Sequence, residues 1–430
     1  MKNLAGIVLA AGLGTRMKSK KPKVFHEVAG KPMIECIIDQ LDKLKLSKIV
    51  IVVGNKESIG ALSNRSHIKF VIQKEKKGTA HAVKQAEKEL KDFKGDIIIL
   101  NGDVPLITAE TLENLVLQHR NSFAKLSLLT AIVDNPTGYG RIVRKNNEII
   151  RITEELDADD MTRQIKEINA GTYCFKSDKL FEVLAKIKKN PLKGEYYLTD
   201  AIEILIREGS KVHTYVVPDN NEILGVNRRF ELAKANKIMQ RRIQEKLLNN
   251  GVTIIDMDNT YIEYDVEVGQ DTIIYPFTFL VGKTKIGENS QIGPFAHITE
   301  SSLGANSKVF QSTIVNSKLK DFVQVGPFSH IRGNTVLQNN VEIGNFVEIT
   351  RSNIGEGTKA YHLSYIGDTK TGADVNFGAG IVTANFDGKK KNKTVIEDKA
   401  YIGSGTTIIA PAKIKKGEFV DNGSLIKKKK

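Results

Sequence analysis

The sequence predicts two domains of different architecture: a doubly wound, Rossmann-like α/β domain and, after it, a parallel β-helix. In the first half of the chain, short apolar runs alternate with segments of helical periodicity, which indicates a mostly parallel sheet with helices on both faces. In the second half, branched apolar residues recur every six positions. An α-helix cannot keep that period on one face, whereas a triangular solenoid with one hexapeptide per side can.

The chain is expected to divide into three segments. Its 430 residues are compatible with two or three domains, at about 150 residues per domain. We assign residues 1–229 to the α/β domain, 230–250 to one helix that connects the domains, and 251–430 to the β-helix. The helix is predicted because apolar residues recur at helical spacing, no Pro or Gly interrupts it, and Gly251 follows it.

Strands and helices alternate near the N-terminus. The strands are expected at 5–11, 48–54, 70–73 and 96–100, and the helices at 32–46 and 78–90. Ligands of such sheets bind at the carboxyl ends of the strands. The expected site therefore lies in the loops after the first and fourth strands, LAAGLGTR at 9–16 and LNGDVPL at 100–106.

The six-residue register predicts the solenoid in detail. It is kept by three runs of apolar residues: Ile262, Val268, Ile274, Leu280, Ile286, Ile292 and Ile298; Val325, Ile331, Leu337, Ile343 and Ile349; Ile402, Ile408, Ile414, Val420 and Ile426. With three hexapeptides per coil, about 180 residues give about ten coils. Between Gly367 and Ile402 the period blurs, and the segment 374–394 is expected to leave the coil as a functional loop.

The net charge of +14 suggests a polyanionic partner. Residues 1–250 hold 43 basic and 31 acidic side chains, residues 251–388 hold 9 and 15, and residues 389–430 hold 12 and 4. The acidic middle interrupts any continuous track for nucleic acid, and no helix-turn-helix, zinc or aromatic RNA-binding motif is present. We therefore expect small phosphorylated substrates and no nucleic acid.

Cysteine usage and hydropathy indicate a cytoplasmic protein. Cys36 and Cys174 lie far apart and match no metal-ligand spacing, so two thiols in a reducing compartment are expected. The apolar start of the chain runs directly into Gly12 and is better explained by a strand than by a signal peptide. No apolar stretch approaches the roughly 20 residues of a membrane span, so no membrane insertion is expected.

The loop at 9–16 is suited to phosphate. Gly12 and Gly14 permit close approach of the backbone, whose N–H groups can cradle an anion, while Arg16 and Lys23 add charge. The spacing is neither that of a Walker loop nor that of a dinucleotide fingerprint. Asp103, which follows an apolar strand and Gly102, is either a Mg²⁺ ligand or a turn residue.

Residues 9–23 and 100–106 together resemble the sugar-phosphate nucleotidyltransferase superfamily. The resemblance continues through NPTGYGRI at 135–142, EINAG at 167–171, GEYYLTD at 194–200 and GVN at 225–227. With the hexapeptide repeats, nearly the whole chain is similar to the bifunctional bacterial N-acetylglucosamine-1-phosphate uridylyltransferases/glucosamine-1-phosphate N-acetyltransferases. This resemblance implies that the β-helix is left-handed and that the enzyme makes UDP-N-acetylglucosamine from glucosamine 1-phosphate, acetyl-CoA and UTP.

The resemblance assigns roles in the first domain. In the implied reaction the sugar 1-phosphate attacks the α-phosphorus of UTP and releases pyrophosphate, so positioning and charge neutralisation are the main tasks. The implied nucleotide-binding and sugar-binding residues are Leu9, Ala10, Ala11, Gly12, Gln73, Gly78, Thr79, Asn101, Gly102, Gly140, Glu154, Asn169 and Asn227. Lys23 and Arg16 would act on the phosphates, and Asp103 and Asn227 would hold Mg²⁺. Asn101 stands where the family often has Tyr.

In the second domain the resemblance makes His362 the general base of acetyl transfer, a role that suits a neutral imidazole near pH 7. The implied acceptor-binding residues are Arg332, Tyr365, Asn376, Asn385 and Lys391, and those for acetyl-CoA are Ala379, Phe386, Ser404 and Asn422. The sequence departs from the family pattern at Thr350, where Lys is common, and at Phe386, where Tyr is common. Because alternate residues of a strand face opposite ways, the adjacent Arg351 is not expected to replace that Lys.

Three alternatives stay open at this stage. The acetyltransferase half could be impaired, which would leave a uridylyltransferase alone, and Thr350, Phe386 and the short segment after the last repeat favour that reading. The chain could instead be a non-catalytic regulatory subunit, although Lys23, Asp103 and Asn227 argue against one. Lys427–Lys430 either meets the phosphates of CoA or is a solvated tail. The repeat class implies a homotrimer whose acetyl-transfer sites are shared between chains.

Overall fold

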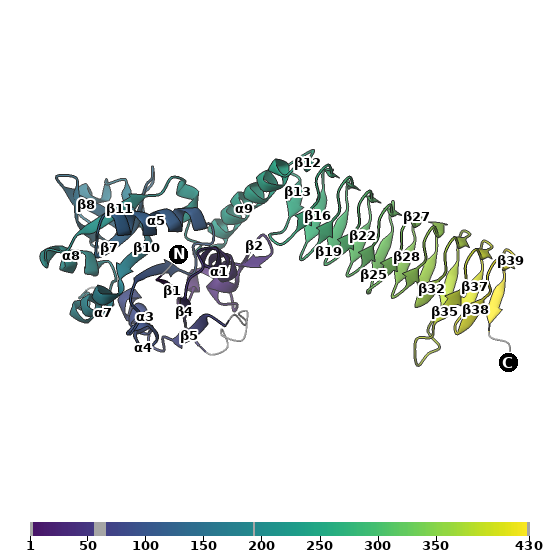
Figure 1. Ribbon diagram of the computed structural model, residues 1–430, viewed down its shortest axis with the longest axis horizontal. Coiled ribbons are helices and arrows are strands. Elements are labelled where there is room, and N and C mark those ends of the chain that lie inside the picture. The colour runs from purple at the N-terminus through teal and green to yellow at the C-terminus, as the bar shows by residue number, and fades with distance from the viewer. Residues whose placement is uncertain (1–2, 56–65, 192–193, 428–430) are drawn as a thin grey trace. The chain divides into compact units, whose positions relative to one another are not determined.

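The computed structural model describes residues 3–55, 66–191 and 194–427 (Figure 1). The chain forms two compact units, Met1–Ile238 and Met239–Lys430. Helix α9, Arg229–Asn249, contains the boundary between them. Each unit has its own hydrophobic core.

The first unit is built on a nine-stranded sheet within the described residues. The main order is β11-β7-β10-β6-β1-β4-β5. The bounds are β1 Leu4–Ala10, β4 Lys48–Val53, β5 Ile68–Ile72, β6 Asp96–Asn101, β7 Leu126–Ile132, β8 Arg141–Lys145, β9 Glu148–Thr153, β10 Glu167–Lys176 and β11 Val212–Val216. Strand β1 is parallel to β4 and β6, whereas β10 is antiparallel to β6 and β7. A hairpin of β2 (Glu27–Val28) and β3 (Lys31–Pro32) lies apart from this sheet.

Helices cover both faces of this sheet. They are α1 Met33–Lys43, α3 Thr79–Lys84, α4 Glu87–Leu90, α5 Ala109–Asn121, α6 Asp160–Arg163, α7 Ser177–Lys186 and α8 Asp200–Arg207, with short 3₁₀ turns at Thr15–Met17, Lys23–Phe25 and Asn220–Ile223. One core cluster packs Ile34 of α1 and Leu112 of α5 against the sheet, and a second packs Val83 of α3 and Leu180 of α7. The predicted doubly wound α/β class is confirmed.

One expected helix is divided. The helix predicted at 78–90 is α3 followed by α4, with the break after Lys84. The side-chain amide of Gln85 donates to the carbonyl of His81 at 2.9 Å, while the Gln85 backbone N–H donates to Ala82. The Gln85 side chain thus takes the His81 carbonyl that its backbone N–H would bind in an α-helix. The backbone N–H binds the carbonyl three residues back instead, as in a 3₁₀ turn.

The second unit is a solenoid whose three sides are parallel sheets of ten, ten and nine strands within the described residues. The first side contains β12 Thr253–Ile254, β15 Ile273–Ile274, β18 Gln291–Ile292, β21 Lys308–Val309, β24 Gln324–Val325, β27 Glu342–Asn345, β30 Lys359–His362, β33 Asn376–Phe377, β36 Tyr401–Ile402 and β39 Phe419–Val420. The second side contains β13 Thr260–Ile262, β16 Thr278–Val281, β19 His297–Thr299, β22 Thr313–Val315, β25 His330–Arg332, β28 Glu348–Thr350, β31 Tyr365–Gly367, β34 Val382–Ala384, β37 Thr407–Ile409 and β40 Leu425–Lys427. The third side contains β14 Glu267–Val268, β17 Lys285–Ile286, β20 Ser302–Leu303, β23 Lys318–Leu319, β26 Val336–Leu337, β29 Asn353–Ile354, β32 Thr369–Thr371, β35 Thr394–Ile396 and β38 Ala412–Ile414.

The apolar register forms the solenoid core. Most of the in-register residues are buried in one continuous cluster, and Val268 and Ile426 pack against it half-buried. Where the register slips, the inward residues are Leu303, Val309, Ile314 and Leu319, at spacings of five or six. Some sides are therefore one residue shorter than a hexapeptide, yet their strands still pair in register with the neighbouring coils.

Buried hydroxyl groups replace aliphatic contacts at the corners of the shortened sides. The Ser317 backbone N–H donates to Ser301 Oγ of the preceding coil at 3.1 Å. Ser301 Oγ in turn donates to the Thr299 carbonyl at 2.7 Å. Because buried N–H groups need a partner, this ladder supports the tight corners.

The excursion from the coil is shorter than the expected 374–394, because Asn376–Phe377 and Val382–Ala384 form β33 and β34 of the solenoid sheets. Only the segment between β34 and β35 leaves the coil. Phe386 and Lys391 form an isolated antiparallel bridge across it. The Asp387 side chain accepts from the backbone N–H groups of Lys389 and Lys390 at 2.9 and 2.8 Å, and these bonds help to lower the pKa of Asp387 to about 2. The loop is thus held by its own hydrogen bonds.

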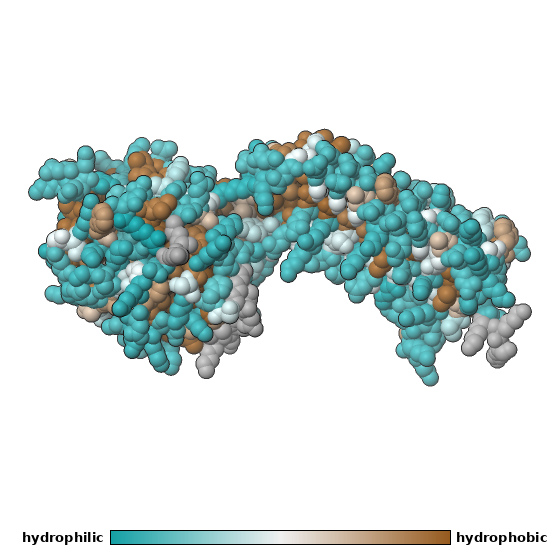
Figure 2. All heavy atoms as spheres, viewed as in Figure 1, coloured by the Kyte–Doolittle hydropathy of each residue, from teal (hydrophilic) through white to brown (hydrophobic). Residues whose placement is uncertain are grey.

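The surface seen in Figure 2 is mainly hydrophilic, with apolar residues in separate patches. Among residues 3–55, 66–191 and 194–427, no helix is both long and apolar enough to cross a membrane.

Shortening one inward side chain tests the core of the solenoid. Ile286 is 4% exposed, whereas the side chain of its neighbour Lys285 is 61% exposed. We expect Ile286→Ala to lower the free energy of unfolding by about 2–5 kcal/mol, because burial is lost and a cavity is left. Lys285→Ala removes an exposed ion pair and should cost at most about 1 kcal/mol. Urea titration followed by far-ultraviolet circular dichroism measures both values, and equal losses would contradict the inward register.

Two candidate active sites

The first candidate site is a pocket of about 600 Å³ at the carboxyl ends of β1 and β6. Leu9 and Asn101, which are paired in the sheet, both line it. The predicted site residues in its lining are Leu9, Ala11, Gly12, Arg16, Lys23, Gln73, Gly78, Thr79, Asn101, Asp103, Glu154 and Asn227. The two loops chosen from the sequence therefore meet at one place. Ala10, Gly102, Gly140 and Asn169 lie outside the lining.

Four polar side chains converge at one corner of this pocket. Lys23 Nζ forms a very short ion pair with Asp103 Oδ2 and donates to Asn227 Oδ1 at 3.1 Å. Arg16 donates to the same Asn227 oxygen at 2.8 Å. The backbone N–H of Val226 donates to the Asp103 carbonyl at 2.8 Å, which brings the 225–227 segment to the end of β6.

This corner fits a divalent cation. A carboxylate oxygen of Asp103 and an amide oxygen of Asn227 both contact the Lys23 ammonium. Two protein oxygens therefore lie close enough together to contact one cation. Mg²⁺ is commonly held by one or two protein oxygens together with substrate phosphates and water. Within the described part of the chain, no group of three or more His, Cys, Asp or Glu side chains is arranged to hold a metal ion. The donor set thus suits an ion that arrives with a nucleotide.

At another side of the pocket, Gln73 is held in place by two contacts. Its amide nitrogen donates to the Gly78 carbonyl at 3.2 Å and lies 3.1 Å from His81 Nδ1. Gly78 has φ of 100°, and a Cβ there would meet the Tyr196 carbonyl oxygen at 2.5 Å, so the position requires glycine. Thr79 Oγ1 accepts from the Leu198 backbone N–H at 2.9 Å. Sequence reasoning missed His81, although it follows Thr79 by two residues.

The predicted sugar residues meet around β10. The Asn169 backbone N–H donates to the Gly140 carbonyl at 2.8 Å, and its side chain donates to the Tyr173 hydroxyl at 2.7 Å. A Cβ on Gly140 would lie 3.5 Å from Glu154 Oε2. Asn101 Nδ2 donates to the Gly171 carbonyl at 3.3 Å, so this departure from the family pattern is accommodated.

Acidic side chains gather beyond Glu154. Burial and the neighbouring carboxylates, Glu154 first among them, raise the pKa of Asp200 to about 6. Burial together with Glu195 raises the pKa of Tyr197 to about 12. The motif GEYYLTD contains both residues, but its spacing alone does not show which side chains approach Glu154.

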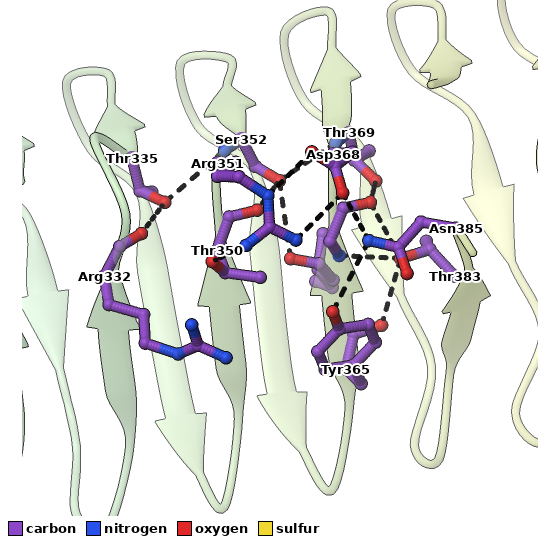
Figure 3. Close-up of polar contacts among 12 residues, drawn as sticks. Arg332, Thr335, Thr350, Arg351, Ser352, Tyr365, Asp368, Thr369, Thr383 and Asn385 are labelled. Carbon is purple, nitrogen blue, oxygen red and sulfur yellow. Dashed lines mark hydrogen bonds and ion pairs between the residues drawn. The ribbon is translucent and has the colours of Figure 1, made fainter. Parts of the chain in front are cut away.

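The second candidate site occupies two corners of the solenoid. The corner between the second and third sides carries Arg332, Arg351, Asp368 and Asn385 on consecutive coils (Figure 3). Arg351 donates to both carboxylate oxygens of Asp368 at 2.9 Å, and Asn385 Nδ2 makes a very short hydrogen bond to Asp368 Oδ2. The hydrogen bonds from Arg351 are the largest cause of the lowered pKa of Asp368.

Tyr365 reaches this corner from the start of β31. Its hydroxyl lies 3.4 Å from Asn385 Nδ2 (Figure 3). A Cβ on Gly367 would come within 2.7 Å of that hydroxyl and 2.6 Å of Asn385 Nδ2, so the absence of a side chain permits the approach. Lys391, in the excursion, lies close enough to contribute to the lowered pKa of Asp368. Arg332 pairs with Glu348 of the next coil.

The corner between the first and second sides carries four other predicted residues. His362 ends β30 and is exposed, and the following coils place Ala379, Ser404 and Asn422 after β33, β36 and β39. The Ala379 backbone N–H donates to Ser404 Oγ at 3.1 Å, and the Ser404 N–H donates to Asn422 Oδ1 at 2.7 Å. These residues form a column along the solenoid.

The two corners are separated by the width of the second side. His362 ends a strand of the first side, whereas Asn385 follows β34 of the second side. Asn376 begins β33 on the first side, and Phe386 is 61% exposed in the excursion. One chain therefore keeps His362 and the column of acetyl-CoA residues apart from most of the predicted acceptor residues. The exceptions are Asn376, on the first side, and Phe386, which follows Asn385.

Comparison with known proteins identifies the family. A family model described as nucleotidyl transferase matches residues 5–225, and one described as bacterial transferase hexapeptide (six repeats) matches residues 316–351. The bifunctional protein GlmU of Geobacillus thermodenitrificans is 47% identical over 426 residues, which cover 98% of this chain and 92% of the relative. GlmU of Halalkalibacterium halodurans is 45% identical, with coverage of 99% and 94%. GlmU of Enterococcus faecalis is 46% identical, with coverage of 96% and 91%.

These matches confirm the family resemblance stated from the motifs. The residues that carried it lie around the pocket and along the solenoid described above. The chain belongs to the family of bifunctional GlmU proteins, transferases that join a nucleotidyl transferase domain to a hexapeptide acyltransferase domain.

Proposed function

We propose that the chain makes UDP-N-acetylglucosamine in two steps. Residues 251–430 transfer an acetyl group from acetyl-CoA to glucosamine 1-phosphate. Residues 1–229 transfer a uridylyl group from UTP to N-acetylglucosamine 1-phosphate and release pyrophosphate. The observation that carries the proposal is the convergence of Lys23, Asp103 and Asn227 at the strand ends. Acetyl-CoA and UTP are cytoplasmic metabolites, so the proposed location is the cytoplasm.

Uridylyl transfer requires two anions to meet. An oxygen of the sugar phosphate forms a bond to the α-phosphorus of UTP as the bond to pyrophosphate breaks, and pyrophosphate leaves. Arg16 and Lys23 line the pocket and reduce the repulsion between the reactants. Asp103 and Asn227 would hold Mg²⁺, which supplies further positive charge to the phosphate oxygens.

The base would be selected by Gln73. Its amide nitrogen donates to the Gly78 carbonyl and lies 3.1 Å from His81 Nδ1. The amide oxygen is then the group that can accept from the N3–H of uracil, which cytosine lacks. The nucleotide would lie against the backbone of Leu9, Ala10, Ala11, Gly12 and Gly102. The sugar would be bound by Glu154 and Asn169.

Acetyl transfer would use the two corners of the solenoid. His362 takes a proton from the amine of glucosamine 1-phosphate as its nitrogen attacks the thioester carbonyl. The carbon–sulfur bond breaks, and CoA leaves as a thiolate that takes up a proton. Arg332, Tyr365, Asn376, Asn385 and Lys391 would hold the acceptor, and the column of Ala379, Ser404 and Asn422, together with Phe386, would hold acetyl-CoA.

Self-association would bring the two corners together. An exposed ladder of four phenylalanines, Phe277, Phe295, Phe328 and Phe346, runs along the corner that ends in His362, with exposures of 46–57%. Phe277 stacks on Phe295 at 4.9 Å between centroids, and Phe328 on Phe346 at 5.4 Å. Gln311 takes the equivalent corner position between the two stacked pairs, so the ladder is interrupted by one coil. An exposed apolar ladder of this kind is typical of a protein interface. We assign it to a homotrimer in which His362 of one chain faces the acceptor residues of the next.

Removing the charge of Lys23 tests the uridylyl site. We expect Lys23→Met to lower the rate of pyrophosphate release from UTP and N-acetylglucosamine 1-phosphate roughly 100-fold, because a positioned charge at the reacting phosphates is lost. CoA release by the same preparation should be unchanged and serves as the folding control. A wild-type enzyme that prefers CTP or ATP to UTP would contradict the assignment of Gln73.

Replacing His362 tests acetyl transfer. We expect His362→Ala to slow CoA thiol release roughly 100- to 10,000-fold, the usual contribution of a general base, while pyrophosphate release persists. The matched control is His297→Ala, because His297 is an exposed histidine of β19 remote from both corner clusters. If thiol release in the wild type does not depend on glucosamine 1-phosphate, the chain is a uridylyltransferase alone.

Charging the phenylalanine ladder tests the trimer. The wild type is expected to sediment at three times the 47.6 kDa of the chain. Phe328→Glu should dissociate it and abolish acetyl transfer without loss of uridylyl transfer, because a charge would be buried at the interface. Phe123→Glu, at an 86% exposed phenylalanine of the first unit, is the control. A monomeric, acetylating wild type would contradict a shared site.

A further inference from the structure

A groove of about 490 Å³ lies on the third side of the solenoid, beside the acceptor corner. Its lining includes Arg351, Asp368, Lys370 and Lys393. Its other lining residues carry no formal charge, so the three cations and one carboxylate leave a net of +2. Such a groove is complementary to a small dianion, for example a phosphate monoester.

Thr350 contributes no charge to this region. Its side chain is 0% exposed, and Thr350 Oγ1 accepts a hydrogen bond from Arg351 at 2.9 Å. Any cation that serves a ligand at this position must therefore come from a neighbouring residue.

Arg351 is directed toward the acceptor residues. Strand β28 ends at Thr350, and Arg351 follows it with φ of 50°, in the left-handed region. The alternation of side chains along a strand does not apply to such a corner residue. The sequence-based expectation that Arg351 faces away from this site is therefore wrong, as Figure 3 shows.

The guanidinium of Arg351 is held but still accessible. Nε and one terminal nitrogen donate to Asp368, and the other terminal nitrogen donates to Thr350. These contacts use three of its five N–H groups and leave one on each terminal nitrogen for Tyr365 or a ligand oxygen. The side chain is 31% exposed, whereas that of Asp368 is 14% exposed. The more buried Asp368 carboxylate thus orients the guanidinium of Arg351 and leaves its other edge accessible.

Asp368 links Arg351 to two residues of the proposed acceptor site. The same carboxylate accepts from Asn385, whose amide lies 3.4 Å from the Tyr365 hydroxyl. Asp368, and after it Tyr365, raise the pKa of Arg351. The phosphate of an acceptor held by Tyr365 and Asn385 would accordingly meet the guanidinium.

We propose that Arg351 binds the phosphate group of the acetyl acceptor, with Lys370 and Lys393 of the groove as supporting charges. The proposal rests on the acetyl transfer proposed above. It adds a determinant that makes the site specific for a phosphorylated amino sugar over the free amino sugar.

The test compares acceptors with and without the phosphate. In the full-length chain, Arg351→Ala should raise the KM for glucosamine 1-phosphate about 10- to 100-fold, the effect of losing a charge-assisted hydrogen bond. The KM for acetyl-CoA and the slow acetylation of unphosphorylated glucosamine should not change. Arg351→Lys should restore part of the loss. Lys413→Ala, which removes an exposed cation of the same side that pairs with Glu397 at 2.6 Å, should behave as the wild type.

Two results would overturn the proposal. An equal loss with both acceptors would show that Arg351 only supports the fold of the corner, and an unchanged KM would show that it does not meet the phosphate. If the wild type does not acetylate at all, calorimetric titration with glucosamine 1-phosphate still decides. If Arg351→Ala binds glucosamine 1-phosphate more weakly than the wild type and Lys413→Ala does not, the phosphate site is supported although acetyl transfer is not. If Arg351→Ala binds it as tightly as the wild type, both the phosphate site and acetyl transfer are rejected.

Discussion

The in-register stacking of one coil on the next is the constraint on which the second half of the molecule depends. Each strand pairs with strands of the neighbouring coils, and the inward aliphatic residues form one continuous core. Residues one coil apart therefore become neighbours at a corner, as Arg351 and Asp368 do at a separation of 17 and Ala379 and Ser404 at 25. Functional columns such as Ala379, Ser404 and Asn422 exist because the backbone repeats, while the side chains at equivalent positions are free to vary.

Both candidate sites hold a cation against an acidic residue. Lys23 pairs with Asp103 in the first unit, and Arg351 pairs with Asp368 in the second. A carboxylate that orients a cation lowers the entropic cost of binding a phosphate, because the side chain is already ordered.

Much of the fold and of the first site could be predicted because the signals are local. The alternation of apolar runs with helical segments predicted the α/β unit, and residues 9–16 and 100–106 do meet at the strand ends. The division of α3 from α4 could not be predicted, since it depends on a side-chain amide that competes with a backbone N–H. The predicted direction of the Arg351 side chain was wrong, because the positive φ of Arg351 after β28 ends the alternation of side chains along the strand.

The sequence by itself determined the two architectures, the apolar register and the residue types that can serve phosphorylated substrates. Periodicity and loop chemistry are properties of neighbouring positions, so they can be read without the fold. Only the tertiary structure decided that His362 lies one corner away from Asn385, and that Gln73 is oriented by His81. Both facts depend on how the coils stack and how distant loops meet. They could not be predicted, because the spacing of these residues in the sequence follows no regular pattern.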